Sequence, residues 1–363
     1  MVAAMRGSRP FFLGTACYAG LAISWWLWAL SGGFPESGPL PLALWHAHAM
    51  IFGYLVAVLS GFLLTTTRGW RVWALFGLWL AGRVAIAVTL ATPGVAGAAL
   101  DLAYLPALAL LRDPPFWRRP KWPTAGFPAL LLALAAADLA FWLDALGILP
   151  GGAEHSLRLA VELIALMIAV IAGRLVPGYT RAMLIPLRAP RHAGLEAASV
   201  AALLLLIAAD TAGWPRLAGG AALLAAALQA WRLAGWRTGA VLGRPLLLIL
   251  HLGFAWLVLG LALFGLALLT PWIAPGDALH GITIGAAGSL TLGMMVRLTR
   301  SQARLPLETD AATSVAFACI VAAAVLRVLG PMVLPTLAGE AILAAGVAWI
   351  AGFALFLARY AVV

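Results

Sequence analysis

WHAHAMIFGYLVAVLSGFLLTTT, the stretch from Trp45 to Thr67, sets two histidines at the mouth of an apolar run that is long enough to cross a bilayer. An imidazole ring is costly to bury in hydrocarbon unless it has a partner. His46 and His48 therefore predict a ligand at this point of the chain. Imidazole is the commonest side-chain ligand of metals, so a metal ion or a haem iron is the expected partner.

The composition of the chain indicates a lipid environment. Of its 363 residues, 64% are hydrophobic and 10% are charged, and the mean hydropathy is +1.02. Soluble domains carry roughly 25% charged residues, so a soluble fold could not hide this much apolar surface. The formal net charge of +10 is explained by arginines in cytoplasmic loops. Because no soluble basic domain is present to carry it, we expect no nucleic-acid binding.

The cysteines limit how a haem can be held. The chain has two, Cys17 and Cys319, and both lie in apolar runs. The sequence therefore contains no disulfide framework, no CxxC metal cluster and no CxxCH motif for covalent haem attachment. Any haem would be haem b, held without thioether bonds by histidines and packing.

Apolar windows of about twenty residues predict an all-α, polytopic membrane protein with about twelve transmembrane helices. The connections are short, which predicts a single transmembrane domain over residues 1–363. In this arrangement all but four of the 23 basic residues fall on one side, which predicts that both termini are cytoplasmic. The predicted spans are 10–30, 41–66, 70–90, 94–112, 126–147, 156–176, 193–211, 214–234, 245–269, 276–298, 310–330 and 337–360.

This topology converts the position of each histidine into a depth. His46, His48 and His280 share one depth near the outer side, whereas His251 lies about six residues, or roughly 9 Å, in from the cytoplasmic side. Imidazoles from different helices commonly clamp a membrane haem, and they can also bind copper. The alternative is that each ring is simply hydrogen-bonded at the interface. The convergence favours His46, His48, His251 and His280 as metal ligands.

Two charged residues are predicted at similar depth on consecutive antiparallel spans. Arg83 and Asp101 lie in the third and fourth predicted spans, and unpaired charges are expensive there. We therefore expect an ion pair or a shared network. Its role is either structural or the binding of a haem propionate by Arg83.

The segment GRLVPGYTRAM (173–183) is a second candidate for anion binding. Arg174 can hold a propionate or a lipid head group, with interface anchoring as the alternative. Pro177 and Gly178 predict that the sixth helix ends here.

The tenth predicted span carries glycines on one side. Gly281, Gly285 and Gly288 allow either a close approach of another helix or a flat macrocycle against the backbone, and helix packing is the favoured interpretation.

Four segments together resemble the NnrS family, a bacterial membrane family associated with nitric oxide and nitrosative stress. The similarity runs in order over nearly the whole chain, and AGR at 81–83 also fits the third span of the family. The segments are WHAHAMIFGYLVAVLSGFLLT (45–65), GRLVPGYTRAM (173–183), HLGFAWLVLGL (251–261) and HGITIGAAGSLTLGMMVR (280–297).

The resemblance implies a fold of about twelve helices with haem and copper. It also implies that the histidines of the family are His46, His48, His251 and His280. Two positions depart from the family pattern: Ala49 replaces an acid in HAHEM, and Gln302 replaces a histidine after the tenth span. If either missing group holds a second metal, this chain lacks that ligand, so the expectation of haem is firmer than that of copper.

The leading hypothesis is a haem-binding protein of the bacterial inner (cytoplasmic) membrane. It would bind or handle nitric oxide or another small diatomic ligand, or protect against nitrosative stress, with or without redox turnover. The alternative is a secondary transporter with intramembrane charges as a coupling relay, although no clear internal repeat supports it. The relay residues would be His251, Arg83, Asp101 and Glu162.

Overall fold

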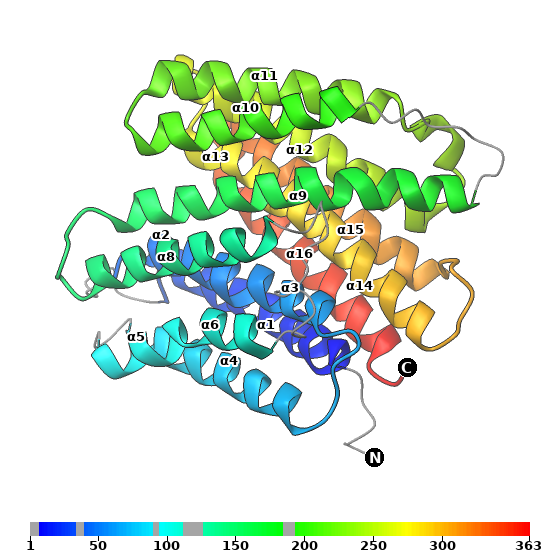
Figure 1. The fold of residues 1–363 in the computed structure, drawn as a ribbon, viewed down its shortest axis with the longest axis horizontal. Helices are drawn as coiled ribbons and strands as arrows, with labels where there is room; N and C mark the ends of the chain where they lie inside the picture. Colours follow the sequence, from blue (N-terminus) through cyan, green and yellow to red (C-terminus); the bar gives the residue numbers. More distant parts are fainter. Residues whose placement is uncertain (1–6, 34–39, 90–93, 112–125, 184–192) are drawn as a thin grey trace. The chain divides into compact units, whose positions relative to one another are not determined.

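The computed structural model folds the chain into helices joined by turns (Figure 1). It describes residues 7–33, 40–89, 94–111, 126–183 and 193–363, and no strand occurs in these ranges. Eleven of the described helices are long and apolar enough to cross a membrane. The prediction of an all-α polytopic membrane protein is therefore confirmed, while the orientation of the termini stays a prediction.

The chain divides into two compact units, unit 1 (Met1–Leu163) and unit 2 (Ile164–Val363). The long helix α9 (Ala153–Met183) begins in unit 1 and ends in unit 2. Each unit is a helical bundle in its own right, and the single domain over residues 1–363 stays a prediction.

Aromatic contacts in unit 1 join its first helix, α1 (Ser8–Trp28), to α3 (Val56–Leu63) and α4 (Trp70–Thr89). The rings of Phe11 and Phe76 meet edge-on with their centroids 5.5 Å apart, and those of Phe12 and Phe62 lie 5.1 Å apart. Besides the first part of α9, unit 1 contains nine described elements. They are α1 (Ser8–Trp28), η2 (Ala29–Gly33), α2 (Leu42–His48), η3 (Ala49–Leu55), α3 (Val56–Leu63), α4 (Trp70–Thr89), α5 (Val95–Leu102), α6 (Tyr104–Leu111) and α8 (Phe127–Ala145).

Unit 2 contains the last part of α9 and a series of long apolar helices linked by short turns (Figure 1). Its elements are α10 (Ala193–Thr211), α11 (Pro215–Ala234), η4 (Thr238–Val241), α12 (Pro245–Leu269), α13 (Pro275–His280), η5 (Gly281–Gly288), α14 (Ser289–Gln302), α15 (Ala311–Val333), η6 (Pro335–Leu337) and α16 (Ala338–Tyr360).

The fourth predicted span, 94–112, is a broken helix. Helix α5 ends at Leu102 and α6 begins at Tyr104. Pro106 accounts for the break, because its nitrogen lacks the hydrogen that would bond to the carbonyl of Leu102. Within the described residues, the structure therefore has eleven full-length apolar helices and one shorter pair where the sequence predicts about twelve spans.

The predicted helix end at Pro177 is wrong, because α9 continues through this proline to Met183. Membrane helices tolerate proline where neighbouring groups satisfy the backbone. Arg232 of α11 lies against this part of α9 and donates from Nη1 to the carbonyl of Ala169 at 3.0 Å. A Cβ atom on Gly173 would overlap its Nη2 atom. Glycine at position 173 therefore makes room for the arginine.

Two π-helical segments directly follow candidate ligand histidines. Segment η3 begins after His48, and η5 begins after His280. The π-helix is rare and is often found at functional sites. Both segments lie in the stretches that carry the family resemblance, which points to the same two histidines.

The predicted close helix approach in the tenth span is confirmed for Gly281 and Gly285. A Cβ atom on Gly281 would lie 2.9 Å from Cα of Gly260, and one on Gly285 would lie 2.6 Å from Cδ2 of Trp256. Both partners belong to α12, so η5 and α12 pack through direct backbone and ring contact.

Replacing Gly281 by alanine is expected to destabilise the protein by about 1–3 kcal/mol, because the added methyl group overpacks the contact with Gly260. Thermal unfolding of the purified protein in detergent measures the loss. Gly220→Ala on α11 is the matched control, since no atom lies within 4 Å of its Cβ position. Equal unfolding midpoints for the two variants would show that the contact is not tight.

Candidate functional site

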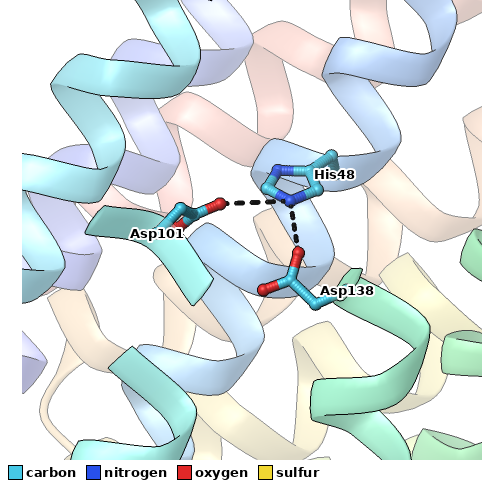
Figure 2. Close-up of side chains that lie close together, drawn as sticks. All are labelled: His48, Asp101 and Asp138. Atoms are coloured by element: carbon cyan, nitrogen blue, oxygen red, sulfur yellow. Dashed lines mark hydrogen bonds and ion pairs between the residues drawn. The ribbon is translucent and has the colours of Figure 1, made fainter. Parts of the chain in front are cut away.

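Four polar side chains from four helices meet inside unit 1. His48 ends α2, Arg83 lies in α4, Asp101 in α5 and Asp138 in α8. Their exposed fractions are 0, 5, 2 and 3%, so water is nearly excluded. Figure 2 shows both carboxyl groups turned toward the His48 ring. Charges at such a position require partners, and these residues supply them to one another.

The Nε2 atom of His48 is the centre of this network. It lies 2.9 Å from Oδ1 of Asp138 and 3.3 Å from Oδ2 of Asp101 (Figure 2). Arg83 pairs with Oδ1 of Asp101, and the indole N–H of Trp142 donates to Oδ2 of Asp101 at 3.0 Å. The predicted ion pair between Arg83 and Asp101 is confirmed, and it is part of a larger network.

Two glycines make room for the network. A Cβ atom on Gly53 would lie 2.8 Å from Nη1 of Arg83, and one on Gly82 would lie 2.8 Å from Oδ1 of Asp101. Glycine weakens a helix relative to alanine. Glycine at these two positions therefore lowers helix stability but allows the backbone to lie close to a buried charged group.

The two carboxylates determine the tautomer of the His48 ring. When the two carboxyl groups are ionised they only accept hydrogen bonds, and Nε2, which faces Asp138 and Asp101, then carries the proton. In the neutral ring Nδ1 is then a bare acceptor. It is buried and has no hydrogen-bond partner within the described residues. The ring stacks on Phe141 at 4.3 Å between centroids, with Phe52 at 5.0 Å.

With both carboxyl groups ionised and the His48 ring neutral, the network carries a formal charge of −1, because Arg83 offsets only one of the two aspartates. A cation at Nδ1 would balance this charge and use the bare lone pair at the same time. Metal-bound histidines usually donate their other ring N–H to a carboxylate or a carbonyl. The arrangement around His48 therefore suits a metal ligand that coordinates through Nδ1.

A second metal geometry places the ion between the three side chains. One ligand atom each from His48, Asp101 and Asp138 lies within 4.8 Å of the others. An ion there would use Nε2 in place of Nδ1, and Asp101 already binds the positive Arg83. Repulsion from this guanidinium disfavours a second cation at the same carboxylate, so Nδ1 is the better candidate.

His46 faces a different helix from His48. Its ring stacks on Trp26 of α1, with the centroids 4.4 Å apart and the planes at 21°. Their separation of about 200° on a regular helix predicts different partners for the two rings, and the contacts agree. Within the described part of unit 1, His48 is the imidazole of this pair that reaches the charged network.

His251, in unit 2, has a hydrogen-bond partner on each ring nitrogen. Its Nε2 lies 2.9 Å from the hydroxyl oxygen of Thr180, and its Nδ1 lies 3.0 Å from that of Thr238. A metal would bind this ring only after one of the two bonds was lost. That His251 is a metal ligand stays a prediction.

His280 ends α13, and its Nδ1 lies 2.5 Å from the carbonyl oxygen of Gly276 in the preceding turn. The neighbouring Gly281 packs on Gly260. Gly260 is nine residues beyond His251 on α12, an axial distance of roughly 14 Å. His251 and His280 are thus held at different levels of the bundle, each with its own contacts.

Three of the four segments that carry the family resemblance meet in unit 2. Thr180 of GRLVPGYTRAM contacts His251, the first residue of HLGFAWLVLGL. The guanidinium of Arg297, which ends the fourth segment, lies 3.8 Å from the ring centroid of Tyr179.

The two arginines predicted to hold a haem propionate already pair with carboxylates. Arg83 binds Asp101, and Nε of Arg174 lies 3.5 Å from Oε2 of Glu196 in α10. A propionate would have to join or replace these acids. That Arg83 and Arg174 bind haem propionates stays a prediction.

Asp138 is the residue of the network that sequence reasoning left without a role. The available signal was its position in the middle of an apolar span, because ionisable residues there are functional candidates by default. Its partner could not be inferred, since His48 is 90 residues away along the chain and no spacing rule joins them.

Replacing Asp101 by asparagine is expected to cost about 3–5 kcal/mol, because it leaves the Arg83 charge buried without compensation. The double variant with Arg83→Gln should regain most of this loss. Thermal unfolding in detergent measures all three proteins. Asp277→Asn, which breaks the more exposed pair with Arg327, is the control, with an expected loss of about 0–1 kcal/mol. A double variant no more stable than Asp101→Asn would contradict the pairing.

Comparison with known proteins agrees with the segments discussed above. The search of curated proteins gives no match. The family described as NnrS protein matches residues 4–363, which is essentially the whole chain, including all of the histidines and the charged network. The chain belongs to the NnrS family.

Proposed function

We propose that this protein binds haem b in the bacterial inner membrane and binds or handles nitric oxide, protecting the cell against nitrosative stress. The observation that carries the proposal is the bare, buried Nδ1 of His48, with Asp138 and Asp101 at the opposite ring nitrogen. Family membership and the apolar helices support the same function.

The surroundings of His48 suit iron or copper better than a hard cation. Magnesium and calcium prefer oxygen ligands, whereas imidazole nitrogen suits iron and copper. Phe52, Phe141 and Trp142 lie around the ring and give it an apolar environment. Such an environment suits nitric oxide, which is small and uncharged.

Each residue of the network has a distinct proposed role. His48 would hold the iron through Nδ1, Asp138 would fix the ring through its Nε2–H, and Arg83 would offset the charge of Asp101. When bound, haem iron supplies a position that takes nitric oxide or carries an electron. Further proposed ligands for haem or a second metal such as copper are His46, His251 and His280, and proposed propionate partners are Arg83 and Arg174.

The contacts favour ligand binding over electron transfer alone. Two imidazoles on one iron suit electron transfer, whereas a single imidazole leaves a position open. Within the described part of unit 1, His46 stacks on Trp26, whereas His48 is the imidazole that contacts the two carboxyl groups. Asp138 would make this ligand more basic through the hydrogen bond to Nε2.

Purified protein is expected to show a Soret band that shifts when nitric oxide is added to the reduced form. His48→Ala should lose the band and the bound iron. Asp138→Asn should keep the haem but bind it about 10–100-fold more weakly, because the outer partner of the ligand is weakened. Absorption spectra and metal analysis of each protein measure these effects.

The matched control is His155→Ala, because His155 is exposed at the start of α9, outside the charged network. It should leave the spectrum unchanged. A His48→Ala protein with an unaltered Soret band and nitric oxide response would refute the role of His48. A colourless, iron-free wild-type protein that moves a solute across vesicles would instead support the transporter alternative, in which the buried charges act as a relay.

A further inference from the structure

A shallow, open groove of about 380 Å³ on unit 2 is lined by Thr238, a hydrogen-bond partner of the buried His251. One of its lining residues, Thr238, is polar, and the others carry small or medium apolar side chains. The lining residues are Ala230, Leu233 and Ala234 of α11, Thr238 of η4, and Ala255 and Val258 of α12.

Hydrogen bonds link Thr238 at the groove to His251 and His251 to Thr180 of α9, and the donor of each bond can be assigned. The Thr180 hydroxyl donates its proton to the carbonyl of Val176 at 2.9 Å. Toward His251 the Thr180 oxygen therefore accepts, which requires the ring proton to be on Nε2. Nδ1 of His251 is then an acceptor, and Thr238 must donate to it.

This assignment of donors leaves the hydroxyl oxygen of Thr238 as an acceptor at the polar end of the groove. Thr238 has used its one proton on His251, but its oxygen keeps a lone pair. The side chain is half-buried, whereas Ala230 and Ala234 are exposed on the surface of unit 2. The groove therefore suits a molecule with an apolar body and a hydrogen-bond donor.

The backbone around Thr238 is held in an unusual conformation. Arg237, directly before it, has φ 60° and ψ 48°, the left-handed region that residues other than glycine seldom adopt. Trp236 packs edge-on against His251 at 6.0 Å and on Phe254 at 4.3 Å between centroids. Strained residues held by surrounding packing cluster at ligand sites, and here the strain positions the Thr238 hydroxyl.

We propose that this groove binds a quinol, a membrane-soluble ring with a hydroxyl group and a long apolar tail. The ring hydroxyl would donate to the Thr238 oxygen, and the ring would lie against Ala255 and Val258. Helices α11 and α12 are candidate membrane spans, so such a molecule reaches the groove from the bilayer. A quinone offers no donor and an acyl chain offers no polar group, so both fit the polar end less well. The proposal does not depend on haem binding at His48.

Equilibrium binding of decylubiquinol and decylubiquinone to the purified full-length protein tests the proposal. Calorimetric titration under reducing and oxidising conditions, in the same detergent, gives both affinities. The wild-type protein should bind the quinol about tenfold more tightly than the quinone, because only the quinol donates to Thr238. Thr238→Val keeps the shape but removes the acceptor, so it should bind the two forms equally.

Ala234→Trp fills the groove and should abolish quinol binding, whereas Ala208→Trp, at an exposed position of α10, should leave it unchanged. These variants keep the test decisive if Thr238→Val does not fold. The proposal is overturned if the wild-type protein binds both forms equally or neither form. It is also overturned if Ala234→Trp binds as the wild type does, or if a saturated phosphatidylcholine displaces the quinol completely, which would identify a site for lipid acyl chains.

Discussion

The charge balance around His48 is the constraint on which unit 1 depends. Three ionisable groups, Arg83, Asp101 and Asp138, are buried among apolar helices, where an uncompensated charge is very costly. They are tolerated because each meets a partner. With both aspartates ionised, the network is short of one positive charge, and it presents one bare imidazole nitrogen at the same place. Structure and proposed chemistry thus have a common cause, since a cation at Nδ1 would balance this charge and use the lone pair of the His48 ring.

Unit 2 uses its buried histidine in a different way. Both nitrogens of His251 are satisfied by hydroxyl groups, from Thr180 and Thr238, without any change in formal charge. This ring therefore behaves as a link in a directional hydrogen-bond chain that leads from a surface groove to α9. Two buried histidines in one membrane protein can thus serve distinct purposes, which depend on whether carboxylates or hydroxyls face the ring.

Periodicity and burial cost predicted much of the fold and part of the site. The apolar windows located the spans, and the cost of unpaired charge predicted the bond between Arg83 and Asp101. They could not predict the break near Pro106 or the continuation of α9 through Pro177, because whether a proline breaks a membrane helix depends on its tertiary surroundings. The role of Asp138 was missed for a related reason: its partner comes from a distant helix, and only tertiary packing brings them together.

The most direct test of the account is the protonation of the His48 ring. Solid-state ¹⁵N NMR of histidine-labelled protein in lipid, prepared without metal or haem, resolves the two nitrogens, and the His48→Ala spectrum assigns them. The account predicts a proton on a hydrogen-bonded Nε2 and a bare Nδ1, whose signal moves when haem is added. A proton on Nδ1, or an Nδ1 signal that haem leaves unchanged, would contradict it.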